Sequence, residues 1–173
     1  MALVFQYGSN CPESQINGKD RLCGDAKFIG IAETVEDFRL AFDVWSTNRQ
    51  CAASDIVESP GSKVWGVLYE VPDFLIERKT ASAQNRRSLD AIEGEGGNYK
   101  RETIAVRRDN GPIVTGLTYR VQSPKPDLKT NLEYVGYIVS GLRERGVRED
   151  YIDHVKKLAQ TNNPAITIEV QEL

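Results

Sequence analysis

The sequence predicts an α+β protein built on a small, largely antiparallel β-barrel or sheet with helices packed on its outside. Short segments rich in β-branched and aromatic residues follow one another without intervening helices. Asp109-Asn110-Gly111 supplies a hairpin turn between two such segments, and the longer helical patterns fall late in the chain. This order differs from the regular alternation of strands and helices that a Rossmann fold or a TIM barrel requires.

Most of the predicted strands are apolar runs bounded by turn residues. The strongest, at residues 63–71, has apolar side chains on both faces and is expected to be central. The turn signal Ser59-Pro60-Gly61-Ser62 precedes it. The strands are predicted at residues 2–5, 27–33, 38–44, 52–58, 63–71, 99–107 and 113–121.

Apolar residues at helical spacing predict two longer helices, at residues 132–145 and 148–160, packed antiparallel to each other. Pro72 is expected to begin a helix that continues to about Thr80, and one helical turn is expected near residues 12–16. From residue 163 the tail alternates as a strand does, and a peripheral, mobile segment fits it as well. We expect a single domain over residues 1–173.

The stretch LDAIEGEGGNY at residues 89–99 contains the strongest candidate for a functional group. Leu89 and Ile92 give a short helix one buried face, and the glycines that follow end it, so Glu93 stands at the helix C-terminus. The negative end of the helix dipole disfavours a charged carboxylate there and is expected to raise its pKa. A solvated glutamate before a flexible turn is the common alternative.

The first predicted strand ends at Tyr7-Gly8-Ser9-Asn10. The backbone N–H groups of such a turn can form a concave nest that binds a carboxylate. The same residues also suit an ordinary turn in which Ser9 or Asn10 caps the next segment. The residues of the turn leave both interpretations open.

Composition narrows the classes of function. The net charge is −3 and the basic clusters are short, which argues against a nucleic-acid or membrane-binding surface. No apolar run is long enough to cross a membrane and the N-terminus lacks signal-peptide features, so we expect a cytoplasmic protein. Three cysteines without C-x-x-C spacing and one histidine, His154, on a predicted helix surface indicate neither a metal site nor a histidine-based nucleophile. Any chemistry would use carboxylates, hydroxyls and backbone groups.

Three motifs in order resemble the γ-glutamylcyclotransferase family and its AIG2-like relatives: FQYGSN at residues 5–10, SPGSKVWGVLYEV at residues 59–71 and LDAIEGEGGNY at residues 89–99. The late segment from Tyr134 through GLRERGVREDY resembles the animal members. Together these motifs extend over most of the chain, and the ordered set is more specific than any one of them. The resemblance implies a small β-barrel flanked by helices.

The resemblance also implies a role for each motif. Tyr7, Gly8, Ser9 and Asn10 would hold the α-carboxylate of a small γ-glutamyl substrate, and Glu93 would act as the catalytic acid/base. Attack of the substrate's α-amine on its own γ-carbonyl would release 5-oxoproline and a free amine or amino acid, without a cofactor. Many relatives are small dimers, so a homodimer is an option that the sequence leaves open. The tyrosines that line the pocket in relatives match Tyr99, Tyr119 and Tyr134.

Two departures from the family pattern affect the expected pocket. Cys11-Pro12 follows the YGSN turn where many relatives have aliphatic residues, and Glu95 adds a second carboxylate. Glu95 either faces solvent or repels an acidic leaving group. Two other functions fit the same motifs: removal of a γ-glutamyl protecting group in a biosynthetic pathway, and a non-catalytic module that binds a carboxylate.

Overall fold

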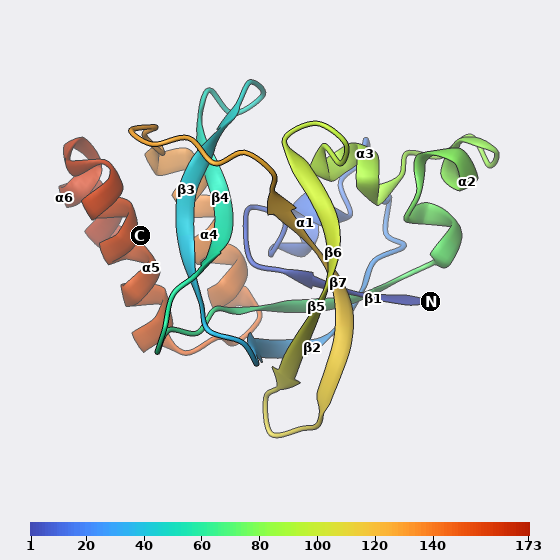
Figure 1. Ribbon diagram of the computed structural model, residues 1–173, viewed down its shortest axis with the longest axis horizontal. Helices are drawn as coiled ribbons and strands as arrows, with labels where there is room; N and C mark the ends of the chain where they lie inside the picture. Colours follow the sequence, from blue (N-terminus) through green and yellow to red (C-terminus); the bar gives the residue numbers. More distant parts are fainter.

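The computed structural model describes residues 1–173, and its main feature is a closed five-stranded β-barrel (Figure 1). All neighbouring strands are antiparallel except the first and last, which are parallel and close the barrel at Val4 and Leu117. The predicted largely antiparallel barrel is confirmed. In order around the barrel the strands are β1 (Ala2–Gln6), β5 (Trp65–Val71), β2 (Lys27–Thr34), β6 (Tyr99–Arg108) and β7 (Ile113–Val121).

The strands β3 (Phe38–Ser46) and β4 (Cys51–Glu58) form a separate two-stranded sheet beside the barrel (Figure 1). The buried Asp55 joins this sheet to the barrel, because its Oδ1 accepts a hydrogen bond of 3.0 Å from the backbone N–H of Val121. Burial raises the pKa of Asp55 to about 6. At the other end of the sheet, Asn98 Nδ2 donates to the Trp45 carbonyl at 3.2 Å, so the β3–β4 turn is held beside the loop that precedes β6.

The two late helices are confirmed within a few residues as α4 (Leu132–Glu144) and α5 (Glu149–Asn162). They pack on each other and α5 contacts β3, so the helical layer lies on the side of the small sheet (Figure 1). His154 is exposed on α5, as predicted. The short helices of the first two thirds of the chain are α1 (Glu13–Ile16), α2 (Arg78–Ser82) and α3 (Leu89–Glu93).

The expectation of a strand at the C-terminus was wrong. The chain forms a 3-10 turn, η2 (Pro164–Ile166), and a helix, α6 (Thr167–Glu172). Asn163 starts the turn, since its side chain accepts a hydrogen bond from the backbone N–H of Ala165. Val170 is completely buried and α6 contacts α4 and α5. Packing against these helices therefore overrides the local strand-like alternation.

The helix expected from Pro72 to about Thr80 is divided into two pieces. Pro72 precedes a 3-10 turn, η1 (Asp73–Leu75), and α2 begins only at Arg78. Glu77 has an extended backbone, with φ −92° and ψ 146°, which interrupts the helical path. Leu75 is fully buried just before this break, so the core contact is kept while the chain changes direction.

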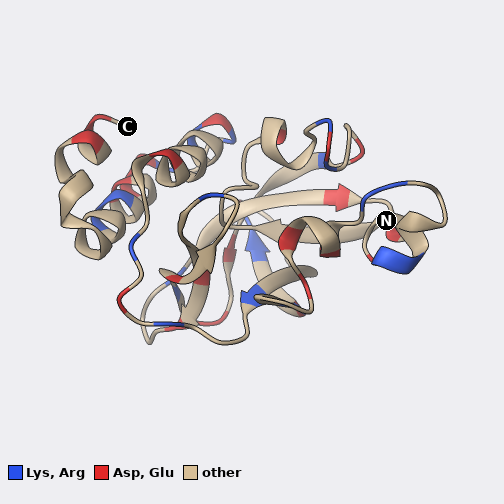
Figure 2. Cartoon of the chain, turned by 90° about the horizontal axis from the view of Figure 1, so that it is seen from above, with Lys and Arg blue, Asp and Glu red and all other residues tan.

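Charges of both signs are interspersed along the helices and loops (Figure 2). None of the helices combines the length and the apolar character that a membrane span requires.

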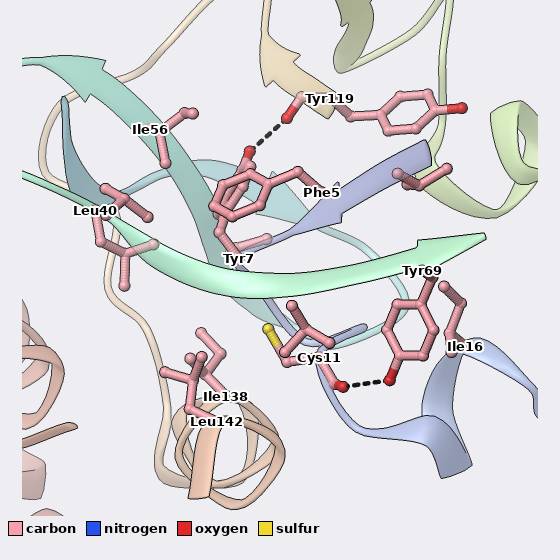
Figure 3. Close-up of a cluster of buried hydrophobic side chains, with 14 of the residues drawn as sticks. Phe5, Tyr7, Cys11, Ile16, Leu40, Ile56, Tyr69, Tyr119, Ile138 and Leu142 are labelled. Atoms are coloured by element: carbon pink, nitrogen blue, oxygen red, sulfur yellow. Dashed lines mark hydrogen bonds between the residues drawn. The ribbon is translucent and has the colours of Figure 1, made fainter. Parts of the chain in front are cut away.

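The loop after β1 is fixed by two tyrosines of the core (Figure 3). Tyr69, on β5, donates a hydrogen bond of 2.7 Å to the carbonyl of Cys11. The Tyr7 hydroxyl donates to the carbonyl of Tyr119 on β7. Because both phenols are buried, these hydrogen bonds are shielded from water and hold the loop in one position.

Helix α4 approaches the exit of this loop at a glycine. A Cβ added to Gly141 would lie 2.4 Å from both the nitrogen and the Cδ of Pro12. Gly136 lies five residues earlier on the same helix, and a Cβ added there would have only the Leu173 Cδ2 nearby, at 3.8 Å. Of these two glycines of α4, only Gly141 is therefore required by close packing.

We expect Gly141→Ala to lower the free energy of unfolding by about 1–3 kcal/mol, because the new methyl group would force α4 and Pro12 apart. Gly136→Ala is the matched control and should stabilise the protein by about 0.5–1 kcal/mol through its higher helix propensity. Urea denaturation of both variants measures the difference. Equal effects of the two substitutions would contradict the close packing at Gly141.

Candidate active site

A cavity of about 450 Å³ opens at one end of the barrel. Its lining comes from the loop after β1, the β3–β4 turn, the segment from α3 to β6 and the first turn of α4. The two motifs that the sequence singles out, around Tyr7 and around Glu93, thus face the same space although they are far apart in the chain.

Glu93 is the last residue of α3 and faces this cavity. The Ser88 side chain caps the start of the helix by accepting from the Ala91 N–H at 3.0 Å, and Leu89 is completely buried. Gly94 ends the helix in the left-handed conformation, with φ 74° and ψ 33°. The predicted helix with a terminal glutamate is confirmed.

The two oxygens of the Glu93 carboxylate have different surroundings. Oε1 accepts hydrogen bonds from Asn10 Nδ2 at 2.8 Å and from Gln6 Nε2 at 2.9 Å. Oε2 has no hydrogen-bond partner within the protein. The two amides therefore orient the carboxylate and leave one oxygen to interact with a bound molecule.

Burial raises the pKa of Glu93, and this effect exceeds the opposing ones. The hydrogen bonds from Asn10 and Gln6 and the positive charge of Arg21 lower the same pKa in part. The direction agrees with the expectation from the sequence, but loss of water around the carboxylate, rather than the helix dipole, is its largest cause.

The loop at residues 7–10 presents backbone donors to the cavity. The carbonyl of Gly8 accepts from the Cys11 N–H at 3.1 Å, which closes a turn. The N–H groups of Gly8, Ser9 and Asn10 donate to no acceptor in the protein, and all three residues line the cavity. Such a group of unpaired N–H donors is suited to an anion.

Three of the four predicted pocket tyrosines donate their hydroxyl protons to the protein. Tyr7 donates to the carbonyl of Tyr119, Tyr99 donates to the carbonyl of Ser54 at 2.7 Å, and Tyr119 donates to Asp90 Oδ1 at 2.7 Å. Burial raises the pKa of all three phenols. These tyrosines line the cavity as neutral walls whose hydroxyl groups already have partners.

Tyr134 differs from the other three tyrosines. Its hydroxyl accepts from the Ser54 N–H at 2.9 Å and lies 2.9 Å from Ser54 Oγ. If the serine donates in the second contact, the phenolic proton is free for a ligand. Tyr134 is thus the one of the four tyrosines whose hydroxyl does not donate to a backbone carbonyl or a carboxylate.

The sequence analysis did not identify three residues that bond to the predicted site residues. Gln6 directly precedes the YGSN motif, so its position at the end of a strand was a usable signal. Arg21 lies in a polar connection and Ser54 in an ordinary strand, and neither carries a motif. Both reach the site through tertiary contacts alone, Arg21 by bonding to Asn10 and Ser54 by bonding to Tyr134.

The second carboxylate of the glycine-rich segment does not line the cavity. Glu95 pairs with Arg78 at 3.2 Å, and the Glu95 carbonyl accepts from the same guanidinium at 2.7 Å. The idea that Glu95 repels an acidic leaving group is therefore not supported by its position. Instead, the charged residues that line the cavity are one acid, Glu93, and three arginines, Arg21, Arg49 and Arg87.

The fold and the cavity define a barrel protein with a partly buried carboxylate opposite an amide-lined loop, an arrangement suited to acid/base chemistry on a small anionic molecule. Residues 4–137 match the family described as Gamma-glutamyl cyclotransferase, AIG2-like. The chain belongs to this family, and the resemblance seen in the motifs is confirmed.

Individual relatives agree with this assignment. The chain is 28% identical to Gamma-glutamylcyclotransferase of Bos taurus over 158 residues, which cover 86% of this chain and 74% of the relative. It is 26% identical to the Homo sapiens protein of the same name, over 90% of this chain and 78% of the relative. A solved structure named Gamma-glutamyl cyclotransferase has the same fold, with a TM-score of 0.74 and 24% identity over 90% of this chain and 86% of that one.

Because the pKa of Glu93 is raised, we expect the stability of the protein to depend on pH. A carboxyl group whose pKa is higher in the folded than in the unfolded protein, where it is about 4.3, destabilises the fold as pH rises between those two values. We therefore expect Glu93→Gln to melt at a higher temperature than the wild type near pH 8, with the difference disappearing by about pH 4. Thermal unfolding followed by circular dichroism at several pH values measures this, and Glu95→Gln controls for loss of an acid outside the cavity. A wild type that gains stability over Glu93→Gln with rising pH would contradict it.

Proposed function

We propose that this protein is a γ-glutamylcyclotransferase that converts a γ-glutamyl amide or dipeptide into 5-oxoproline and a free amine or amino acid. The observation that carries the proposal is the free Oε2 of Glu93 in the same cavity as the unpaired N–H groups of Gly8, Ser9 and Asn10. Membership of the family and the names of the relatives support the reaction class.

In this proposal the loop holds the substrate and Glu93 moves protons. The N–H groups of Gly8, Ser9 and Asn10 bind the α-carboxylate, which orients the α-amine toward the γ-carbonyl carbon of the same molecule. Ring closure needs no external nucleophile, so much of the rate comes from positioning these two groups.

Proton transfer accompanies the exchange of one C–N bond for another. The α-ammonium group gives a proton to Oε2 of Glu93, and the resulting amine attacks the γ-carbonyl carbon to form the ring bond. Glu93 then returns a proton to the departing nitrogen as its C–N bond breaks. The ring nitrogen then gives a second proton to Glu93, which passes it to the released amine to form an ammonium ion. In total the α-nitrogen loses two protons and the leaving amine gains two, so Glu93 ends in its starting state.

The environment of Glu93 suits this role. Burial raises its pKa, which brings proton gain and loss closer to neutral pH.

Negative charge develops on the γ-carbonyl oxygen during attack, and a donor near that oxygen stabilises it. Tyr134 is the best-placed tyrosine for this role, since the hydroxyls of Tyr7, Tyr99 and Tyr119 donate to the protein.

The direct test is release of 5-oxoproline from a library of γ-glutamyl amides and dipeptides, measured by chromatography. We expect turnover by the wild type and a loss of about 10²–10⁴-fold in kcat/KM for Glu93→Gln, since the variant cannot accept a proton. Glu95→Gln should keep wild-type activity because Glu95 lies outside the cavity. Absence of turnover with every substrate, or an unaffected Glu93→Gln variant, would refute the proposal; binding of 5-oxoproline without turnover would indicate a non-catalytic module.

The arginines of the cavity support a leaving group with a negative charge. Arg49 is held in place by Gln15 Oε1 at 2.7 Å and lies 4.5 Å from the Tyr137 ring centre, and Arg87 donates to the Asp20 carbonyl at 3.0 Å. Because no second acid lines the cavity, a carboxylate on the departing amine meets attraction rather than repulsion there. We therefore propose that the leaving amine is an amino acid or a peptide rather than a simple amine.

We expect Arg49→Gln to raise KM by about 5–30-fold for γ-glutamyl amino acids, which corresponds to about 1–2 kcal/mol for one lost charge-assisted hydrogen bond. The KM for a γ-glutamyl alkylamide, whose leaving group is uncharged in the substrate, should change little. Steady-state kinetics with matched substrates measures the ratio. Equal effects on both substrates would show that Arg49 does not select for the carboxylate.

A further inference from the structure

The Asn10 carboxamide lies between two groups of opposite charge. Its Nδ2 donates to Glu93 Oε1 at 2.8 Å, and its Oδ1 accepts from the guanidinium of Arg21. A guanidinium has donors only, so it can bind only the oxygen end of the carboxamide. Contact with Arg21 therefore leaves the NH₂ end of Asn10 facing the carboxylate.

Contacts of its neighbours fix the backbone on both sides of Arg21. The loop that carries it is closed at its base by Asn17, whose side chain accepts from the Ala26 N–H at 2.9 Å and donates to the Ala26 carbonyl at 2.8 Å. Leu22 is completely buried, and its carbonyl accepts from Arg86 at 2.9 Å. These contacts fix the loop from which the Arg21 guanidinium reaches Asn10.

We propose that Arg21 is a positioning residue for Glu93: Arg21 orients the Asn10 carboxamide so that the NH₂ group of Asn10 faces the Glu93 carboxylate. Without Arg21 the Asn10 carboxamide can rotate so that its oxygen and nitrogen exchange places. The oxygen would then lie against Glu93 Oε1 with no proton between them. Two acceptors at this distance repel, which disfavours the charged carboxylate. Arg21 thus keeps Glu93 able to ionise, and this catalytic meaning depends on the proposed cyclotransferase function.

The other titratable groups around Glu93 do not duplicate the charge of Arg21. Among them, Arg21 is the only one whose charge lowers the Glu93 pKa. Burial is the largest cause that lowers the pKa of the Arg21 guanidinium, and the charges of Arg49 and Arg87 lower it further. Neither of these two charges is among the causes that shift the pKa of Glu93. The remaining neighbours are phenols and a thiol whose pKa values burial raises, so they stay neutral: Tyr7, Cys11, Tyr99 and Tyr119.

The test is a ¹³C NMR titration of the Glu93 carboxyl group in the full-length protein, with the signal assigned by its absence in Glu93→Gln. We expect Arg21→Gln to raise the Glu93 pKa by about one unit and Arg21→Lys, which keeps a charged donor, to restore most of the wild-type value. Arg107→Gln, which removes an exposed positive charge elsewhere on the barrel, is the control and should leave the signal unchanged.

The same titration in the Asn10→Ala background separates orientation of the carboxamide from simple attraction between charges. If Arg21 acts through Asn10, Arg21→Gln should shift the Glu93 pKa less in this background than in the wild type. An unchanged pKa in the single variant, or an equal shift in both backgrounds, would overturn the inference.

Activity supplies a separate readout. With a γ-glutamyl alkylamide as substrate, the acidic limb of the kcat/KM profile of Arg21→Gln should move to higher pH by the same amount as the NMR pKa. A limb that stays in place while activity falls uniformly would indicate a structural role only and would overturn the inference. Since the NMR titration needs no turnover, failure of the proposed reaction and failure of the positioning role are distinguishable.

Discussion

Two hydrogen bonds to one carboxylate oxygen connect the parts of this protein on which its site depends. Gln6 ends the first barrel strand and Asn10 lies in the loop after it, and both amides bind Oε1 of Glu93, 87 and 83 residues further along the chain. The barrel positions the loop, while the short helix α3 positions the glutamate. Because both amides bind the same oxygen, the other oxygen has no hydrogen-bond partner within the protein.

The environment that raises the pKa of Glu93 is unfavourable for folding. Burial of a carboxylate without a directly paired cation raises its pKa and destabilises the charged form. The rest of the structure tolerates this because the surrounding loop is fixed independently, by Tyr69 on one side and Tyr7 on the other. The stability of the barrel core thus offsets the unfavourable burial of the Glu93 carboxylate.

Local sequence patterns predicted the elements well where side-chain periodicity and turn residues agree. The hairpin of β6 and β7 follows from alternation on both sides of Asp109-Asn110-Gly111, and α3 follows from Leu89 and the glycine at its end. The tail after Asn162 was predicted wrongly, because an isolated alternation of apolar residues does not reveal that α4 and α5 offer a surface for a helix. The direction of the Glu93 pKa was predicted correctly, although its main cause is burial, which only the folded chain defines.

The sequence by itself determined the barrel class, the family and the two motifs of the site, because turn chemistry, strand alternation and the ordered motifs are local properties. Only the tertiary structure decided which groups face each other. It turned Glu95 away to Arg78, directed the hydroxyls of Tyr7, Tyr99 and Tyr119 into the protein, and brought Arg21 and Ser54 to the site from segments without a motif. These contacts depend on how the loops and the small sheet pack on the barrel, and no local pattern encodes such long-range packing.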